Sequence, residues 1–122
     1  MPRTEVVVYA EEDGSAPLLR WLADLPQPMA RDKITVRIER LQDMGHELRR
    51  PEADYLRDGI YELRVAAWGV QYRVLYFFGG KRAVLSHGII KKSGAVPARE
   101  IEVAIGRRAL FEADPNKHAF AL

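Results

Sequence analysis

The chain has 122 residues, of which 48% are hydrophobic and 30% are charged, as is typical of one soluble globular domain. It has no cysteine, which excludes disulfides, thiol nucleophiles and cysteine metal sites, and no apolar run reaches the roughly 18 residues of a membrane span. The first residues lack the apolar stretch of a signal peptide, so we expect a cytoplasmic location.

The net charge of +2 conceals an asymmetry between the two halves of the chain. Residues 1–55 carry 8 Lys or Arg and 11 Asp or Glu, whereas residues 56–122 carry 11 and 6. No acidic residue lies between Glu62 and Glu100. That stretch contains seven cations: Arg64, Arg73, Lys81, Arg82, Lys91, Lys92 and Arg99. A basic block of this kind predicts either an anion-binding face or a solvated face that keeps the protein soluble.

The first half of the chain predicts one strand and two helices. Residues 5–10 are rich in β-branched side chains and end at an acidic, glycine-containing turn, which is typical of a strand. A helix is expected after Ser15, a suitable N-cap, and the Pro-Gln-Pro turn at residues 26–28 ends it. A second helix is expected from Met29 to Met44, with Gly45 at its C-terminal end, so the two helices form a hairpin.

The second half predicts three strands and a final helix. Three alternating runs are separated by glycine turns and lie at residues 60–68, 70–78 and 82–90. A last helix is expected to begin near Pro97 and to end at about Asp114, after which the chain is expected to be loosely held. An N-terminal strand, a helical hairpin, a three-stranded antiparallel meander and a C-terminal helix predict a single α+β domain over residues 1–122.

Strand alternation assigns faces to the candidate site residues. Glu62 and Arg64 share one face of the first meander strand, and Gln71 and Arg73 share a face of the second, opposite Tyr72. Arg64 is therefore expected either to pair with Glu62 or to bind an anion. Arg73 has no acidic residue in its own strand, so we expect it to bind an external anion. Whether the two arginines meet depends on the register of the hairpin.

The third meander strand carries the remaining polar candidates. His87 and Lys91 are four residues apart and share a face. His87 is expected either to be a hydrogen-bonded structural residue or to act as a general acid, because imidazole titrates near neutrality. Ser86 and His87 are neighbours, so their side chains are expected on opposite faces, where they make a poor nucleophile–base pair. Histidine spacing predicts no metal site, and Gly79-Gly80-Lys81 lacks the other residues of a phosphate loop, so no cofactor is expected.

Three segments resemble strands and a helix of one protein family. The first is Leu-Arg-Asp-Gly-Ile-Tyr-Glu-Leu-Arg at residues 56–64, which is similar to L-x-x-G-[IL]-[YW]-E-L-R. The second is Tyr-Arg-Val-Leu-Tyr at residues 72–76, which is similar to Y-R-[VI]-L-[YF]. Residues 87–104 are similar to H-[GA]-F-x-K-K-[ST]-x-x-x-P-x-x-E-[IL]-x-x-A, with Ile89 in place of the aromatic residue and no extra lysine in the loop at residues 94–96. Together the segments resemble phage-derived HigB-like toxins of the RelE/ParE superfamily.

The resemblance implies a RelE/ParE-like fold and the toxin of a type II toxin–antitoxin system. Such toxins cut mRNA in the ribosomal A site and are silenced by an antitoxin, usually a helix-turn-helix protein encoded beside the toxin. In RNA cleavage the 2′-OH attacks its neighbouring phosphate, so the protein needs to bind the phosphate, stabilise charge and move protons.

This chemistry suggests roles for individual residues. Arg64 and Arg73 are expected to clamp the phosphate, Lys91 with Lys92 to act as base or charge stabiliser, and His87 to act as general acid. Tyr72 or Tyr76 is expected either to stack on a base or to pack in the core. Three further cations are expected to bind the RNA: Lys81, Arg82 and Arg99.

Two other functions fit the same sequence. ParE-like members of the superfamily inhibit DNA gyrase and do not cut RNA, and Lys91, Lys92 and His87 favour the HigB-like alternative. A non-catalytic module derived from a phage protein would retain the basic face but would tolerate Arg73→Ala or Lys91→Ala with little loss beyond affinity.

Overall fold

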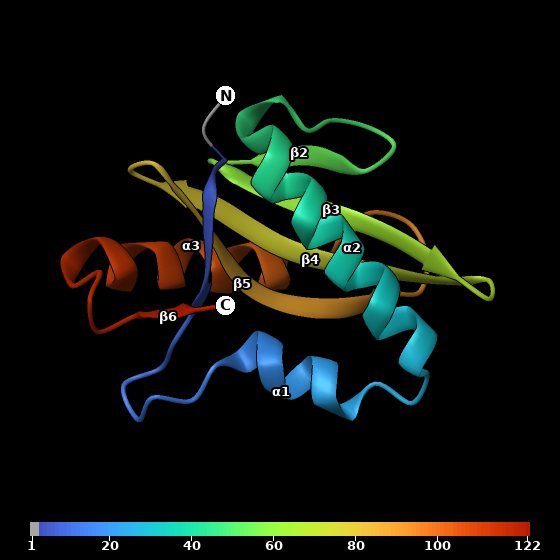
Figure 1. Cartoon of the computed structure of the whole chain (residues 1–122), viewed down its shortest axis with the longest axis horizontal. Helices are drawn as coiled ribbons and strands as arrows, with labels where there is room; N and C mark the ends of the chain where they lie inside the picture. Colours follow the sequence, from blue (N-terminus) through green and yellow to red (C-terminus); the bar gives the residue numbers. More distant parts are fainter. Residues whose placement is uncertain (1–2) are drawn as a thin grey trace.

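A six-stranded sheet with helices on both faces makes up the protein in the computed structural model, which describes residues 3–122 (Figure 1). The helices are α1 (Pro17–Asp24), α2 (Pro28–Met44) and α3 (Ala98–Ala113), with a 3₁₀ turn, η1, at Gly45–Glu47. The strands are β1 (Glu5–Tyr9), β2 (Ala53–Arg57), β3 (Ile60–Ala67), β4 (Val70–Gly79), β5 (Arg82–Lys91) and β6 (Ala119–Ala121). No helix in this part of the chain combines the length and the apolar character needed to cross a membrane.

The strand order is β2-β3-β4-β5-β1-β6, and β1 runs parallel to β5 while the other neighbours are antiparallel. The predicted α+β class, helical hairpin and β3-β4-β5 meander are confirmed. Two short edge strands, β2 and β6, were not predicted. The tail was expected to be loosely held, but it forms β6 against β1, and buried His118 bonds through Nδ1 to the Ala10 carbonyl oxygen at 2.7 Å.

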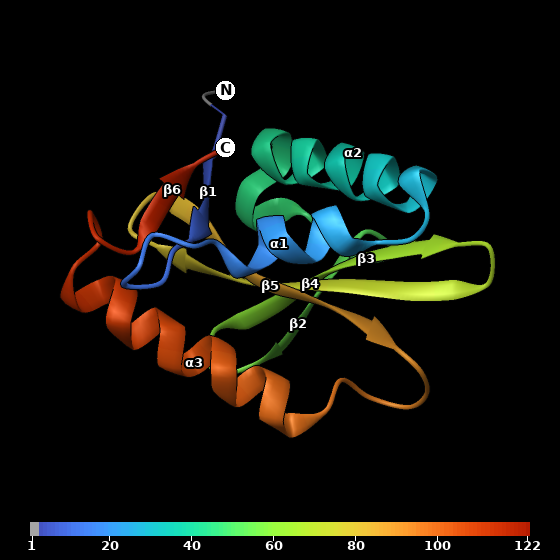
Figure 2. The ribbon, with the colours of Figure 1, turned by 90° about the horizontal axis from the view of Figure 1, so that it is seen from below.

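The sheet separates two apolar clusters. Figure 2 shows the helices that cover its two faces, α1 and α2 on one side and α3 on the other. The helical hairpin α1–α2 covers one face, where Leu18, Ile34 and Leu41 are fully buried. On the opposite face α3 packs through Ile101, Ala104 and Phe111. Because the central strands are buried on both sides, their sequences are almost continuously apolar.

The ends of the helical hairpin differ in how well the sequence predicted them. Gly45 follows α2 with a φ of 55°, a conformation that glycine adopts without the steric cost of a Cβ. Ser15, however, is not the N-cap of α1. The cap residue is Ala16, and the Ser15 hydroxyl bonds to the Asp13 carboxylate at 2.6 Å instead.

A β-bulge in β5 determines which face its second half presents. Leu85 pairs with Tyr76 and His87 pairs with Leu75, so Ser86 is an extra residue with no partner in β4. Beyond it the alternation is inverted. His87, Ile89 and Lys91 consequently lie on the α3 side of the sheet, whereas simple alternation from Leu85 would place them on the α1 side.

Candidate basic cleft between the sheet and the loop before helix α3

The central feature of the site is a carboxylate held between two arginines. Arg64 of β3 lies directly opposite Arg73 of β4 in the sheet register. Glu62 accepts a hydrogen bond from Arg64 Nη1 through Oε2 at 2.7 Å, and its Oε1 lies 3.3 Å from Arg73 Nε. The register therefore brings the two predicted arginines together, and the ion pair expected as one alternative for Arg64 is present.

Arg73 does not face an external anion as the sequence predicted. Its side chain is 2% exposed, and Nη1 donates to the Tyr72 carbonyl at 2.9 Å and to Gln71 Oε1 at 3.3 Å. Burial lowers the pKa of Arg73, and the charge of Arg64 lowers it further. Arg73 is therefore connected to the cleft through Glu62, its ion-pair partner on β3, which strand alternation alone cannot identify.

A cavity of about 360 Å³ opens above this cluster, between β2–β3 and the loop that joins β5 to α3. We call it the basic cleft. Its lining residues are Arg50, Asp54, Leu56, Glu62, Arg64, Lys91, Gly94, Ala95 and Val96. Arg64 is about a quarter exposed, and Arg37 of α2 donates to its carbonyl oxygen at 2.6 Å, which fixes the strand at this position. Two carboxylates share this lining, Asp54 paired with Arg50 and Glu62 paired with both arginines, so Lys91 is the cation of the lining without an ion pair among the described residues.

A second hollow of about 300 Å³ lies beside the same loop and shares Lys91 with the basic cleft. Lys92 and Arg99 are exposed there, and Glu100, at the start of α3, lines it as well. The two predicted lysines and Arg99 are thus close to one another at the exit of β5. This end of the sheet offers several cations around one turn of chain.

His87 lies in a hydrogen-bonded chain that joins β5 to α3. Its Nε2 is 3.0 Å from Glu100 Oε1 and its Nδ1 is 2.8 Å from Ser86 Oγ. A carboxylate only accepts, so Nε2 carries the proton and Nδ1 of the neutral ring accepts from the serine hydroxyl. The expectation that Ser86 and His87 point to opposite faces is wrong, because the bulge at Ser86 breaks the alternation.

These hydrogen bonds limit the ability of His87 to exchange a proton with a substrate. The residue is 9% exposed, both ring nitrogens are occupied, and burial lowers its pKa despite the opposing hydrogen bond to Glu100. Arg107 closes the network by donating to Ser86 Oγ at 3.4 Å and pairing with Glu11 at 3.2 Å. The geometry matches the structural alternative for His87, whereas Glu100 presents a carboxylate to the hollow.

Three predicted RNA-binding residues lie away from the cleft. Tyr72 is 2% exposed and faces the helical hairpin, with its ring 6.2 Å from that of Trp21, so it cannot stack on a base; Tyr76 is likewise buried. Lys81 and Arg82 lie at the β4–β5 turn, roughly 30 Å along β5 from Lys91.

The sequence missed Glu100 and Arg50 as site residues. Glu100 occupies the glutamate position of the third motif, so a signal for it was available, whereas Arg50 lies before β2, a strand that was not predicted. No three His, Asp or Glu side chains gather as a possible metal site within residues 3–122.

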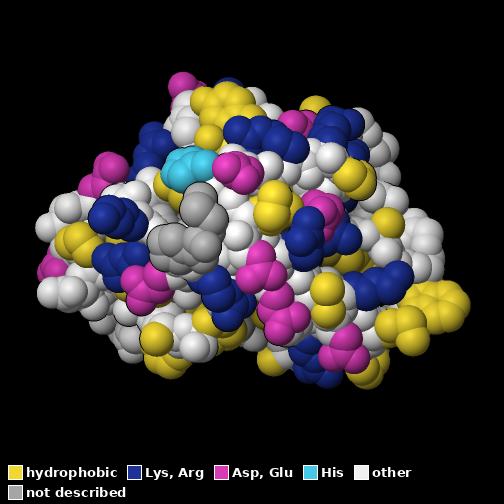
Figure 3. All heavy atoms as spheres, turned by 45° about the horizontal axis from the view of Figure 1, so that its top comes forward, with side chains coloured by type: hydrophobic (Ala, Val, Ile, Leu, Met, Phe, Trp, Pro, Cys, Tyr) yellow, Lys and Arg dark blue, Asp and Glu magenta, His cyan; other side chains and the backbone are white. Residues whose placement is uncertain are grey.

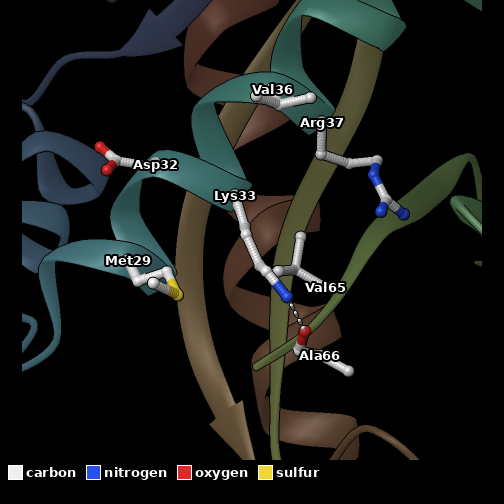
Figure 4. Close-up of a pocket in the computed structure, with 7 residues that line it drawn as sticks. All are labelled: Met29, Asp32, Lys33, Val36, Arg37, Val65 and Ala66. Atoms are coloured by element: carbon white, nitrogen blue, oxygen red, sulfur yellow. Dashed lines mark hydrogen bonds between the residues drawn. The ribbon is translucent and has the colours of Figure 1, made fainter. Parts of the chain in front are cut away.

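Two other surfaces, the face shown in Figure 3 and the hollow shown in Figure 4, offer fewer groups for binding or catalysis. On the side shown in Figure 3, dark-blue and magenta side chains are interspersed, so this side presents no continuous positive surface. Figure 4 shows a hollow of about 300 Å³ between α2 and β3, where Lys33 Nζ donates to the Ala66 carbonyl oxygen at 3.4 Å. Its remaining lining residues are Met29, Asp32, Val36, Arg37 and Val65. Apolar side chains and two cations paired within the fold give this hollow little chemistry.

Comparison with known proteins identifies a family. No curated protein sequence matches the chain. A sequence model of the family described as "Phage derived protein Gp49-like (DUF891)" matches residues 20–116, which include α2, β2 to β5, all of α3 and therefore the whole basic cleft. The phage-derived character expected from the three motifs is confirmed by this match. The chain belongs to the Gp49-like family of phage-derived proteins, a family associated with toxin–antitoxin systems.

Proposed function

We propose that the protein is the toxin of a type II toxin–antitoxin system and that it cuts mRNA, without a cofactor, while the mRNA is bound in the ribosomal A site. The observation that carries the proposal is the basic cleft, where Arg50, Arg64 and Lys91 line one cavity and buried Arg73 pairs with Glu62 of the same lining. Cations around a concave site bind phosphate, and arginine does so bidentately.

The reaction needs no nucleophile from the protein. The 2′-oxygen of one nucleotide attacks its own 3′-phosphorus, a P–O bond forms, and the bond to the 5′-oxygen of the next nucleotide breaks. The products are a 2′,3′-cyclic phosphate and a free 5′-hydroxyl, with one proton leaving the 2′-OH and one reaching the 5′-oxygen. The protein contributes by binding the phosphate, stabilising its added negative charge and accepting and donating these protons.

The proposal assigns these tasks differently from the roles expected from the sequence. Arg64, Lys91 and Lys92 bind the phosphate and stabilise charge, because their ends reach the cleft or the adjoining hollow. Glu100 is the carboxylate that lines the adjoining hollow beside Lys91 and Lys92, and His87 holds it through Oε1. Arg73 and His87 are therefore positioning residues in this proposal, acting through Glu62 and Glu100 respectively.

A non-catalytic RNA-binding module is the second candidate. It is favoured by one observation, the occupation of both ring nitrogens of His87 within the fold. Such a module would use the same cations around the cleft and would lose only affinity when they are removed.

The proposed partner is an antitoxin, usually a helix-turn-helix protein encoded beside the toxin. To silence the toxin it would either cover the basic cleft or displace α3. Displacing α3 would remove Glu100 from His87 and Arg107 from Ser86, so the hydrogen-bonded chain of the site would be broken.

The test is to map mRNA 5′ ends by primer extension in a cell-free translation reaction, with and without ribosomes. The wild type is compared with Arg64→Ala and Lys91→Ala, and with the charge-matched surface controls Arg20→Ala and Lys117→Ala. In the wild type we expect new cuts that lie within codons and appear only when ribosomes are present. The rate of cleavage should fall on the order of 10²-fold in the cleft variants and should not change in the controls.

Other outcomes separate the alternatives. Cuts that do not need ribosomes would retain the nuclease and remove the A-site mechanism. Binding of RNA without cuts would support the non-catalytic module. Neither cuts nor binding would contradict the proposal, and gyrase supercoiling would then be the assay for the ParE-like function.

A further inference from the structure

Trp68 is exposed to an unusual degree for its residue type and its position. Its side chain is 70% exposed, more than any other large hydrophobic residue in residues 3–122. It is the first of two residues in the turn between β3 and β4, and both Trp68 and Gly69 have positive φ, 54° and 77°. Turns of this type favour Asn, Asp or Gly, and a left-handed conformation costs other residues about 1–2 kcal/mol. Neither burial nor turn geometry accounts for a tryptophan here.

The sheet register places this turn at the same end of the molecule as the basic cleft. Gln71 pairs with Ala66 on one side and with Lys91 on the other, so Trp68 lies three residues beyond the last pair of β4 and β5, roughly 10 Å along the strand. In Figure 2 the β3–β4 turn and the loop between β5 and α3 project from the same end of the sheet. Lys91 and Lys92 lie at the start of that loop, beside the cleft.

An exposed indole ring at the same end of a sheet as several cations is a combination suited to binding unpaired nucleic acid. Bases of single strands stack on aromatic side chains, while lysine and arginine bind the phosphates between them. We infer that Trp68 stacks on an unpaired base of single-stranded RNA whose backbone enters the basic cleft at Lys91 and Arg64. The inference rests on the proposed RNA function and adds to it a residue that holds the strand beside the cleft.

The chain offers a direct readout of this contact. It has two tryptophans, and the second, Trp21, packs on Gly88 and edge-on against Tyr72, on the face covered by the helical hairpin. Stacking of a base on Trp68 should quench its fluorescence, whereas Trp21 should be unaffected. Variants that retain one tryptophan at a time assign the signal.

The experiment titrates the full chain with a short single-stranded 2′-O-methyl RNA of mixed sequence, which binds as RNA but lacks the hydroxyl needed for cleavage. Binding is followed by anisotropy of a labelled oligonucleotide and, separately, by intrinsic fluorescence. We expect quenching in the wild type and in Trp21→Phe but not in Trp68→Phe. Trp68→Ala should lower affinity about tenfold or more.

Two further variants keep the test decisive. Trp68→Asn suits the left-handed turn, so a loss of RNA affinity in this variant cannot be attributed to a damaged hairpin. Phe120→Ala removes another exposed aromatic side chain, from β6, and should bind RNA like the wild type.

The outcomes distinguish this inference from the function on which it rests. One outcome would show that the role of Trp68 is wrong while the RNA function stands. In it, Lys91→Ala weakens RNA binding, Trp68→Ala and Trp68→Asn bind RNA normally, and RNA does not quench the fluorescence of the wild type. If the wild type does not bind this RNA, the inference about Trp68 is wrong, and the cleavage assay with ribosomes decides the proposed function separately. If Trp68→Ala binds RNA normally but fails to bind a protein partner, Trp68 belongs to a protein interface and the inference is overturned.

Discussion

At the scale of single residues, the buried carboxylate of Glu62 tests the ion pairs of the candidate site. It is 3% exposed and lies between Arg64 and Arg73, of which Arg73 is also buried. Removing one partner of a buried ion pair leaves an uncompensated charge, which typically costs about 3–5 kcal/mol. Glu62→Gln is therefore expected to lower the free energy of unfolding by about this amount in urea denaturation. Glu12→Gln, which removes an exposed partner of Lys117, should leave stability unchanged, and equal effects of the two would contradict the assignment.

His87 predicts how stability depends on pH. Burial lowers its pKa below the ordinary value of 6.5, although the hydrogen bond to Glu100 opposes the shift. As pH falls below 6.5 the unfolded chain takes up a proton that the folded protein takes up only at lower pH. The unfolded state thus binds more protons in this window, and the free energy of unfolding should fall.

The measurement is urea denaturation in buffers on both sides of pH 6.5. His87→Gln should flatten the decline, whereas His46→Gln, at an exposed position in η1, should retain it. A decline that is equally steep in His87→Gln would show that another group is responsible.

At the scale of secondary-structure elements, two glycines with opposite surroundings test how the helices pack. A Cβ on Gly88 in β5 would overlap the ring of Trp21, so the close contact between α1 and the sheet requires glycine there. A Cβ on Gly106 in α3 would meet open space. Gly88→Ala should therefore destabilise the protein by about 1–3 kcal/mol, and Gly106→Ala should stabilise it by about 0.5–1 kcal/mol. Thermal denaturation of the two variants measures both signs, and a neutral Gly88→Ala would contradict the packing of α1.

The elements also show where prediction from sequence succeeded. β3, β4 and β5 are long and separated by glycine turns, so their alternation identified them, and the helical hairpin followed from its apolar spacing and prolines. β2 and β6 are short, at five and three residues, and they lie at the edges of the sheet, where burial imposes little pattern. Their existence depends on tertiary pairing, which no local signal encodes.

For the candidate site, the sequence identified the residues better than it identified their contacts with one another. It found the cations at the exit of β5, but it assigned Arg73 to an external anion because its partner Glu62 belongs to another strand. It also placed Tyr72 as a stacking residue, although the sheet turns this ring toward the helical hairpin. Cross-strand partners and the orientation of a strand relative to its covering helices follow from register and packing, which are non-local.

At the scale of the whole molecule, the proposed antitoxin has two routes to silence the protein, and hydrogen exchange separates them. If the antitoxin covers the basic cleft, amides of the β5–α3 loop should be protected in the complex and α3 should remain protected. If it displaces α3, amides of residues 98–113 should exchange faster unless the antitoxin itself replaces their contacts. A complex that leaves both regions unchanged would contradict this account of inhibition.

The extra residue in β5 is the one position at which the strand can lose a residue without turning over. In a relative that lacked Ser86, the histidine would follow Leu85 directly and still lie opposite Leu75, so the histidine and the first lysine would remain on the α3 side. Such a relative would lose the hydroxyl that joins His87 to Arg107. A one-residue gap at a paired position between His87 and Lys91 would instead turn the first lysine toward the helical hairpin, so the place of a gap in an alignment separates proteins that share the motif from proteins that share the cleft.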